Sequence, residues 1–178
     1  MNLLYQYGGL WLDSTILVTE PLKNHKKLLE QPFFTQKFYQ EKDNSCHLAD
    51  NMAYGRWAGF IQGTSILHNP LFAFEKDFFA EYWRDFDEVI DYVLMDFMME
   101  LAYENNSAVR KEFDDVPINN TGVWHLLSHL NAPYAQFPYD KILPETFLHK
   151  LNWRAQLDMN TPDTVFREIQ RRYAPETN

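Results

Sequence analysis

The chain has 178 residues, enough for one ordinary domain with a sizeable core. Hydrophobic residues make up 46% of it, and glycine and proline are few and scattered, so the composition excludes a disordered or low-complexity protein. The formal net charge of -9 excludes a general nucleic-acid binder, because such a protein needs a basic surface to displace counterions from phosphates.

Cysteine content and hydropathy bear on where the protein works. Cys46 is the only cysteine, so no internal disulfide can form, and a cytoplasmic location is the simplest expectation. The first twelve residues lack the basic segment and cleavage site of a secretory signal. Acidic residues interrupt even the most apolar stretch, 89–102, so we expect no transmembrane segment. Work at the inner face of a membrane would then require peripheral recruitment.

The beginning of the chain predicts the end of a helix followed by two strands. Residues 3–7 are mostly apolar, and Gly8-Gly9 then supplies a helix stop with freedom for positive φ. The apolar run 10–12 is typical of a buried strand, and Asp13 follows it directly. A second β-rich run lies at 16–18. The pattern places a carboxylate at the end of a strand.

Further along, the pattern predicts two long helices, a strand and a last helix. Asn69 is typical of a helix cap, and Pro70 suits the first helical position. Other expected elements are a strand and turn over 52–61, a second helix over about 87–104 with an apolar stripe of Ile90, Leu94, Phe97 and Leu101, a strand over 146–154, and a helix that opens at Thr161-Pro162.

Two ionisable residues fall among apolar neighbours in this pattern. In the second helix, Asp96 shares a face with Met99 and Tyr103, and a buried carboxylate needs a partner or a function. In the strand over 146–154, His149 shares a face with Phe147 and other apolar residues. A structural interpretation stays open for both: a carboxylate bound to nearby backbone or arginine, and a satisfied core histidine.

Several segments, in order, resemble the capsular polysaccharide synthesis protein family, relatives of glycosyltransferase family 32. The first, LLYQYGGLWLDST at 3–15, resembles the helix end, Tyr-Gly-Gly turn and acid-bearing strand of that family. The resemblance continues through Trp57, 82–83, 89–96, 114–120 and 147–151, and so extends over about residues 3–154.

The resemblance implies an α/β fold of the GT-A type, a mixed sheet flanked by helices, in a single domain over residues 1–178. Family members carry nucleotide-binding strands before this point, so we expect the sheet to be incomplete at the N-terminus. The implied activity is that of a bacterial hexosyltransferase, which moves a sugar from a nucleotide-sugar donor to a saccharide or lipid-linked saccharide acceptor in capsule or exopolysaccharide biosynthesis. The family likeness also suggests retention of anomeric configuration.

The resemblance also suggests a set of site residues. Asp13 occupies the place of the Asp-x-Asp motif, but Ser14 and Thr15 follow it, so the second carboxylate is replaced by a hydroxyl. Mn²⁺ or Mg²⁺ is the implied cofactor, with Asp13 and His149 as metal ligands. The candidates for catalysis are Asp13, Asp96 and His149, and those for substrate binding are Tyr7, Gly8, Gly9, Trp57, Asn119, Asn120 and Lys150.

Structural interpretations remain open for several of these residues. Asp13 suits a turn or cap, Trp57 a hydrophobic core, and Asn119 a loop whose backbone it holds. Two other classes of protein also remain open. One is a non-catalytic remnant or acceptor-binding subunit, and the other is a metal-dependent hydrolase that uses Asp13, Asp96 and His149, although no familiar metal motif accompanies them.

The genomic sequence upstream of Met1 would separate these classes. An in-frame continuation with an apolar strand and an Asp-containing helix would favour the transferase, whereas a promoter and ribosome site there would favour the remnant. For the chain as given, we expect weak nucleotide-sugar binding and an exposed apolar flank beside Asp13.

Overall fold

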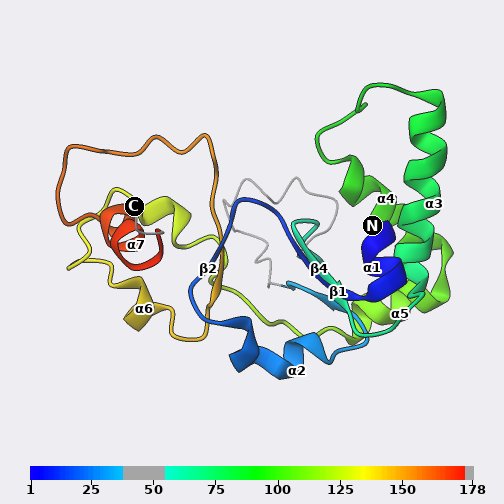
Figure 1. Ribbon diagram of the computed structural model, residues 1–178, viewed down its shortest axis with the longest axis horizontal. Helices are drawn as coiled ribbons and strands as arrows, with labels where there is room; N and C mark the ends of the chain where they lie inside the picture. Colours follow the sequence, from blue (N-terminus) through cyan, green and yellow to red (C-terminus); the bar gives the residue numbers. More distant parts are fainter. Residues whose placement is uncertain (38–54, 175–178) are drawn as a thin grey trace. The chain divides into compact units, whose positions relative to one another are not determined.

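The computed structural model describes residues 1–37 and 55–174, which form two compact units (Figure 1). The first unit contains Met1–Asp13 and His25–Asn119, and the second contains Ser14–Asn24 and Asn120–Asn178. The expectation for Cys46, and the part of the expected strand and turn at 52–54, lie outside the described residues.

The first unit combines helices with a small antiparallel sheet. Its helices are α1 (Asn2–Tyr7), α2 (Lys26–Leu29), α3 (Pro70–Asp85), α4 (Leu94–Asn105) and α5 (Ser107–Asp115), and its strands are β1 (Gly9–Leu12), β3 (Phe34–Thr35) and β4 (Ile61–Thr64). The strand order is β1-β4-β3, with Gly9 opposite Thr64 and Leu12 opposite Ile61. Among the described strands, β1 therefore lies at an edge.

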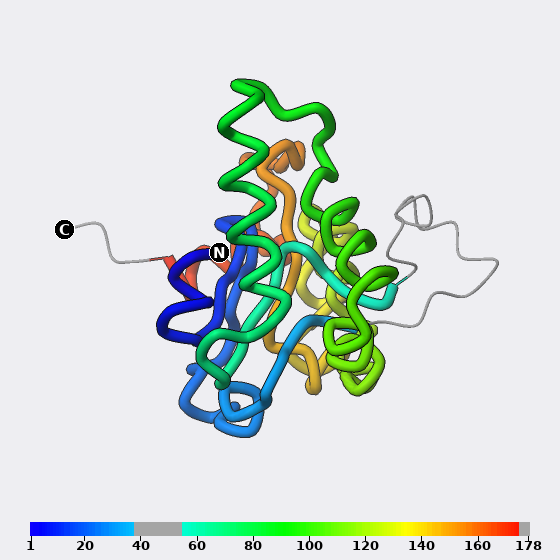
Figure 2. Tube along the Cα trace, turned by 90° about the vertical axis from the view of Figure 1, so that its right-hand side faces the viewer, coloured from blue at the N-terminus to red at the C-terminus, as the bar shows by residue number. Residues whose placement is uncertain are grey.

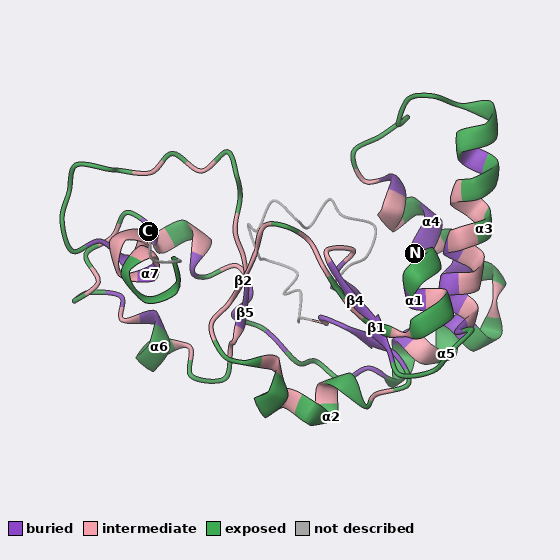
Figure 3. Ribbon diagram, in the orientation of Figure 1, coloured by how far each residue is buried: buried purple, intermediate pink, exposed green. Residues whose placement is uncertain are grey.

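The predicted helix end and first strand are confirmed as α1 and β1, but the predicted burial of β1 is wrong. Trp11 is 37% exposed, and Leu10 and Leu12 are only partly buried. A strand with one neighbour has one side without a partner strand, which leaves its residues less covered than those of central β4. All four β4 residues are buried (Figure 3).

The turn between α1 and β1 requires glycine. Gly8 has φ of 66°, and a Cβ at that position would lie 2.8 Å from the Thr64 carbonyl oxygen. An L-residue there would meet both an unfavourable backbone conformation and a steric collision. The Gly8 N–H donates to the Leu4 carbonyl at 2.9 Å and closes the helix.

The helices build the core of this unit. Buried side chains from α1, α3, α4 and α5 pack with Phe33 and Trp57, and α1 lies against α3 (Figures 1 and 2). The predicted start of α3 is confirmed, since the Asn69 side chain accepts from the Leu71 and Phe72 N–H groups. Its amide also donates to Glu112 of α5 at 2.7 Å.

The second helix begins later than predicted. Residues 86–93 form no helix, and α4 starts at Leu94. The Tyr82 hydroxyl donates to the Glu88 carbonyl and accepts from the Ile90 N–H, so this segment is bound to α3 by tertiary hydrogen bonds. The predicted apolar stripe is wrong except for Leu94, because the other buried residues of α4 are Met98, Met99 and Ala102.

The second unit contains a two-stranded antiparallel sheet and short helices. Its elements are β2 (Ile16–Val18), β5 (Leu148–Lys150), α6 (Tyr139–Ile142), α7 (Val165–Tyr173) and a 3-10 turn at Leu127–His129. Strand β2 confirms the second β-rich run, whereas the strand predicted over 146–154 is shorter. The predicted last helix begins at Val165, where the Thr164 hydroxyl accepts from the Arg167 N–H.

Candidate functional site

Asp13 lies at the end of the edge strand of the first unit. Its N–H donates to the Phe60 carbonyl at 3.0 Å, so the pairing of Leu12 with Ile61 continues by one residue. This bond places Asp13 beside the loop 57–60 that precedes β4. The prediction of a carboxylate at a strand end is therefore confirmed.

Asp96 contacts the same loop from α4. The Trp57 indole N–H donates to Asp96 Oδ1 at 3.1 Å, and a Cβ on Gly59 would lie 3.4 Å from the same oxygen. Burial raises the pKa of Asp96, and the bond from Trp57 opposes that rise. The fold thus brings two of the predicted acids, 83 positions apart in sequence, to one loop.

The Trp57 ring itself is fully buried. It packs between Tyr103 and Phe113, with ring centroids 5.9 and 4.8 Å away, and the Arg56 guanidinium lies over it at 4.6 Å. The ring therefore forms part of the core, as the structural interpretation had it, while its N–H orients Asp96. A substrate role for Trp57 stays a prediction, without an exposed ring surface to support it.

The two predicted asparagines hold backbone in place. Asn119 donates to the Thr35 carbonyl at 2.9 Å and accepts from the Lys37 N–H at 3.1 Å. Asn120, in the second unit, donates to the Leu148 carbonyl at 2.9 Å and accepts from the Thr146 hydroxyl at 3.2 Å. Both side chains have structural partners, and Asn120 is buried. Tyr7, by contrast, is 73% exposed just before the Gly8-Gly9 turn.

Lys150 brings a positive charge to the segment that follows Asp13. In the second unit, its ammonium donates to the Thr15 hydroxyl, and the backbone of Lys150 pairs with that of Ile16. The resemblance described above suggests that Thr15 replaces the second carboxylate of an Asp-x-Asp motif. The structure therefore gives Thr15 a lysine as its hydrogen-bond donor.

His149 is the most buried of the predicted catalytic residues. It lies in β5 opposite Leu17, is 1% exposed, and meets Tyr139 edge-on at 6.1 Å. Burial lowers its pKa to about 4, and the Thr146 backbone opposes that decrease. No hydrogen bond of normal geometry reaches either ring nitrogen from the described residues. The imidazole is thus neutral at pH 7 and surrounded mainly by apolar groups.

Asp13 belongs to no larger cluster of metal-binding side chains in the part of the chain that the structure describes. Within 1–37 and 55–174, no three or more His, Cys, Asp or Glu side chains gather as a metal-binding group. Asp13 fits the mode of Mg²⁺ binding in which one or two carboxylates and the substrate phosphates share the ion with water.

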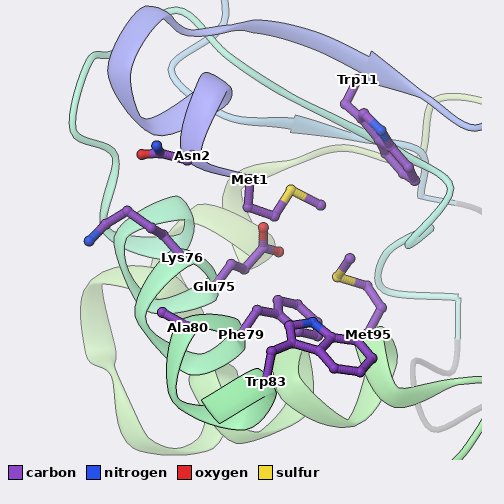
Figure 4. Close-up of a pocket in the computed structure, with 9 residues that line it drawn as sticks. All are labelled: Met1, Asn2, Trp11, Glu75, Lys76, Phe79, Ala80, Trp83 and Met95. Atoms are coloured by element: carbon purple, nitrogen blue, oxygen red, sulfur yellow. The ribbon is translucent and has the colours of Figure 1, made fainter. Parts of the chain in front are cut away.

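Sequence reasoning missed Glu75 and the pocket around it. Glu75 of α3 is 0% exposed although it carries a carboxylate. It lines a cavity of about 780 Å³ in the first unit, with Trp11, Phe79, Trp83 and Met95 among its walls (Figure 4). One signal was available, since Glu75 lies four residues after Leu71 and four before Phe79, on the buried face of the helix.

No helix in the described parts of the chain has the length and apolar character needed to cross a membrane. The fold is mixed α/β, with small antiparallel sheets and helices. In its candidate site, Asp13 at the end of β1 binds the loop 57–60, and Asp96 of α4 contacts the same loop.

Comparison with known protein families assigns this mixed α/β chain to one family. The chain matches the family described as capsular polysaccharide synthesis protein over residues 1–169, and it therefore belongs to that family. The resemblance inferred from the sequence is thereby confirmed, and the family links the chain to capsular polysaccharide synthesis. No curated protein and no solved structure gave a significant match.

Proposed function

We propose that the protein transfers a sugar from a nucleoside diphosphate donor to a saccharide or lipid-linked saccharide acceptor during capsule synthesis. The observation that carries the proposal is the position of Asp13, at the end of β1 in a chain that belongs to the capsular polysaccharide synthesis family. Residues 3–15 resemble the acid-bearing segment of capsular polysaccharide synthesis proteins, relatives of glycosyltransferase family 32 that are similar in fold to the GT-A type, and this likeness supports the same reaction.

Transfer of a sugar leaves negative charge on the departing diphosphate. In the proposal, Asp13 holds Mn²⁺ or Mg²⁺, which neutralises that charge when bound. In the second unit, Lys150 binds the Thr15 hydroxyl and is a separate candidate for binding phosphate. These local charges matter because the chain as a whole carries -9.

Asp96 and His149 have different places in the proposal. The Trp57 N–H fixes one oxygen of Asp96, which leaves the other to accept a sugar hydroxyl. His149 is neutral near pH 7, the form in which an imidazole binds a metal ion, but its apolar surroundings equally suit a core residue. Loss of activity in His149→Leu, with folding intact, would support the functional role.

The reaction is tested in membranes from cells that lack or retain the gene. Membranes are incubated with a panel of radiolabelled nucleotide sugars, and label is measured in lipid-linked and polymeric products. The proposal expects one donor whose label reaches product only when the gene is present. Equal incorporation with every donor in both strains would contradict it and would favour a non-catalytic binding subunit.

A further inference from the structure

We propose that the cavity around Glu75 is a binding pocket for an N-acetylated sugar, whose pyranose ring stacks on tryptophan while its acetamido group meets the buried carboxyl group. This inference rests on the proposed function, because it names the substrate class that the protein would handle. It comes from three features of the pocket: its aromatic walls, its buried polar group and its otherwise mostly apolar lining.

The walls of the pocket present aromatic surface to solvent. Trp11 and Trp83 are 37% and 49% exposed, and both line the cavity. Figure 4 shows Trp11 reaching toward the cavity from β1, with Trp83 and Phe79 on its opposite side. Indole rings offer a flat apolar surface, and the C–H face of a pyranose is complementary to such a surface. The cavity volume of about 780 Å³ lies in the range of small-molecule sites.

Glu75 supplies the polar group at the inner end. Its carboxyl group points into the space between Met1, Trp11 and Met95 (Figure 4). The residue is 0% exposed, and neither carboxyl oxygen has a hydrogen bond of normal geometry from the part of the chain that the structure describes. Buried polar groups normally have partners, so an unsatisfied one that lines a cavity indicates a missing ligand group.

The other lining groups narrow the ligand class. The Lys76 ammonium binds Asp77 and points away from the cavity (Figure 4). Apart from Glu75, Lys76 and Asn2, the lining residues are apolar or aromatic. A hexose without an acetamido group could bring a hydroxyl to Glu75, but it has no methyl group to pack against the apolar walls. An entirely apolar ligand would leave Glu75 unsatisfied. An acetamido group combines a methyl group for the walls with a polar amide for Glu75.

The protonation state of Glu75 agrees with this ligand. Burial raises its pKa to about 8, and the Met1 amino group and the Gln62 side chain oppose the rise. At neutral pH the group is therefore mainly a carboxylic acid, which donates one hydrogen bond and accepts others. The carbonyl of an acetamido group needs a donor and its N–H needs an acceptor, and a carboxylic acid offers both.

The test compares sugars and variants by saturation-transfer NMR and tryptophan fluorescence. N-acetylglucosamine and N-acetylgalactosamine are titrated against glucose and galactose, at pH 6.5, into the wild type and into Trp83→Ala. Trp153→Ala is the matched control, because Trp153 is 75% exposed and belongs to the second unit. We expect Trp83→Ala to weaken N-acetylated sugar binding at least about tenfold and Trp153→Ala to leave it unchanged.

Variants of Glu75 separate its role from a loss of folding. Glu75→Gln keeps the shape and both kinds of hydrogen-bonding group, so it should retain binding, whereas Glu75→Leu should lose it while thermal unfolding stays cooperative. Equal binding of glucose and N-acetylglucosamine, or unchanged binding in both Trp83→Ala and Glu75→Leu, would overturn the proposal. So would the absence of N-acetylated sugar binding to the wild type.

A third arm identifies the source of the sugar. UDP-N-acetylglucosamine is titrated beside the free sugar, because the same ring is available from a donor or from an acceptor. Binding that depends on Trp83 supports the pocket in either case, and tighter binding of the nucleotide form assigns it to the donor. Label transfer in membranes without any binding at Trp83 would refute the pocket alone, whereas binding without transfer would refute the proposed function alone.

Discussion

Glu75 is the residue whose burial has the clearest energetic consequence. Its pKa is raised to about 8, so the folded protein keeps a proton that the unfolded chain releases near pH 4.5. The stability that this proton contributes is complete below pH 4.5 and is lost as the pH rises through about 8. The loss amounts to about 1.4 kcal/mol for each pH unit at most.

Replacement of Glu75 should remove this pH dependence. We expect the free energy of unfolding of Glu75→Gln to exceed that of the wild type by more at pH 8.5 than at pH 5, because the amide never ionises. Urea unfolding at several pH values measures the difference, and Glu145→Gln, at an exposed position, is the control. An identical pH dependence in wild type and Glu75→Gln would show that Glu75 is not buried as described.

The pH dependence of stability that His149 contributes has the opposite sign to that of Glu75. Because its pKa is lowered to about 4, the unfolded chain takes up a proton below pH 6.5 that the folded protein does not. Wild-type stability should therefore fall as the pH decreases from 6.5 toward 4. His149→Leu should reduce this fall, as followed by thermal unfolding at pH 7 and pH 5, while the exposed His125→Leu should not. An equal fall in wild type and His149→Leu would contradict the burial of the imidazole.

These two residues also show what the sequence could reveal at this scale. The apolar neighbours of His149 correctly predicted its burial, although not that both faces of the short strand β5 are covered at Leu148 and His149. Glu75 was missed because a charged residue is normally assigned to the solvent face. Whether it is buried depends on what covers α3 in space, which spacing along the helix indicates only weakly.

At the scale of elements, signals within a few residues were the most reliable. Asn69-Pro70 correctly predicted the start of α3, and Gly8-Gly9 the end of α1, since caps and stops depend on local backbone chemistry. The predicted start of α4 was wrong because the Tyr82 hydroxyl of α3 binds the backbone within 86–93. The buried stripe of α4 was wrong too, because Met98 and Met99 face the core in place of Phe97 and Leu101.

The turn between α1 and β1 gives a test at this scale. Gly8→Ala should lower the free energy of unfolding by about 1–3 kcal/mol, because φ is 66° and the added Cβ would lie 2.8 Å from the Thr64 carbonyl. Chemical denaturation measures the change. Gly59→Ala is the control, since its Cβ would make only ordinary contacts, the nearest at 3.4 Å from Asp96. Equal stability of wild type and Gly8→Ala would contradict the described turn.

At the scale of the whole molecule, the main constraint is charge. A protein with a net charge of -9 repels a nucleoside diphosphate at long range, so binding has to rely on local cations. The family match over 1–169 includes Asp13, which we propose to hold a metal cation, and Lys150, which is itself positively charged. The sequence predicted the family because several segments that resemble it occur in the same order along the chain. The contact between Lys150 and Thr15 depends on strand pairing and was visible only in the structure.

The most direct test of the proposed transfer is a single codon change in the gene itself. Asp13→Asn removes the carboxylate but keeps its size, and Asp87→Asn makes the same change at an exposed position. Membranes from both strains are assayed for transfer of radiolabelled sugar from the active donor, at matched protein levels. We predict that Asp13→Asn loses at least about 99% of the transfer rate, as expected when a group needed for charge stabilisation is removed, and that Asp87→Asn keeps it. Near-normal transfer by a folded Asp13→Asn protein would contradict the assignment.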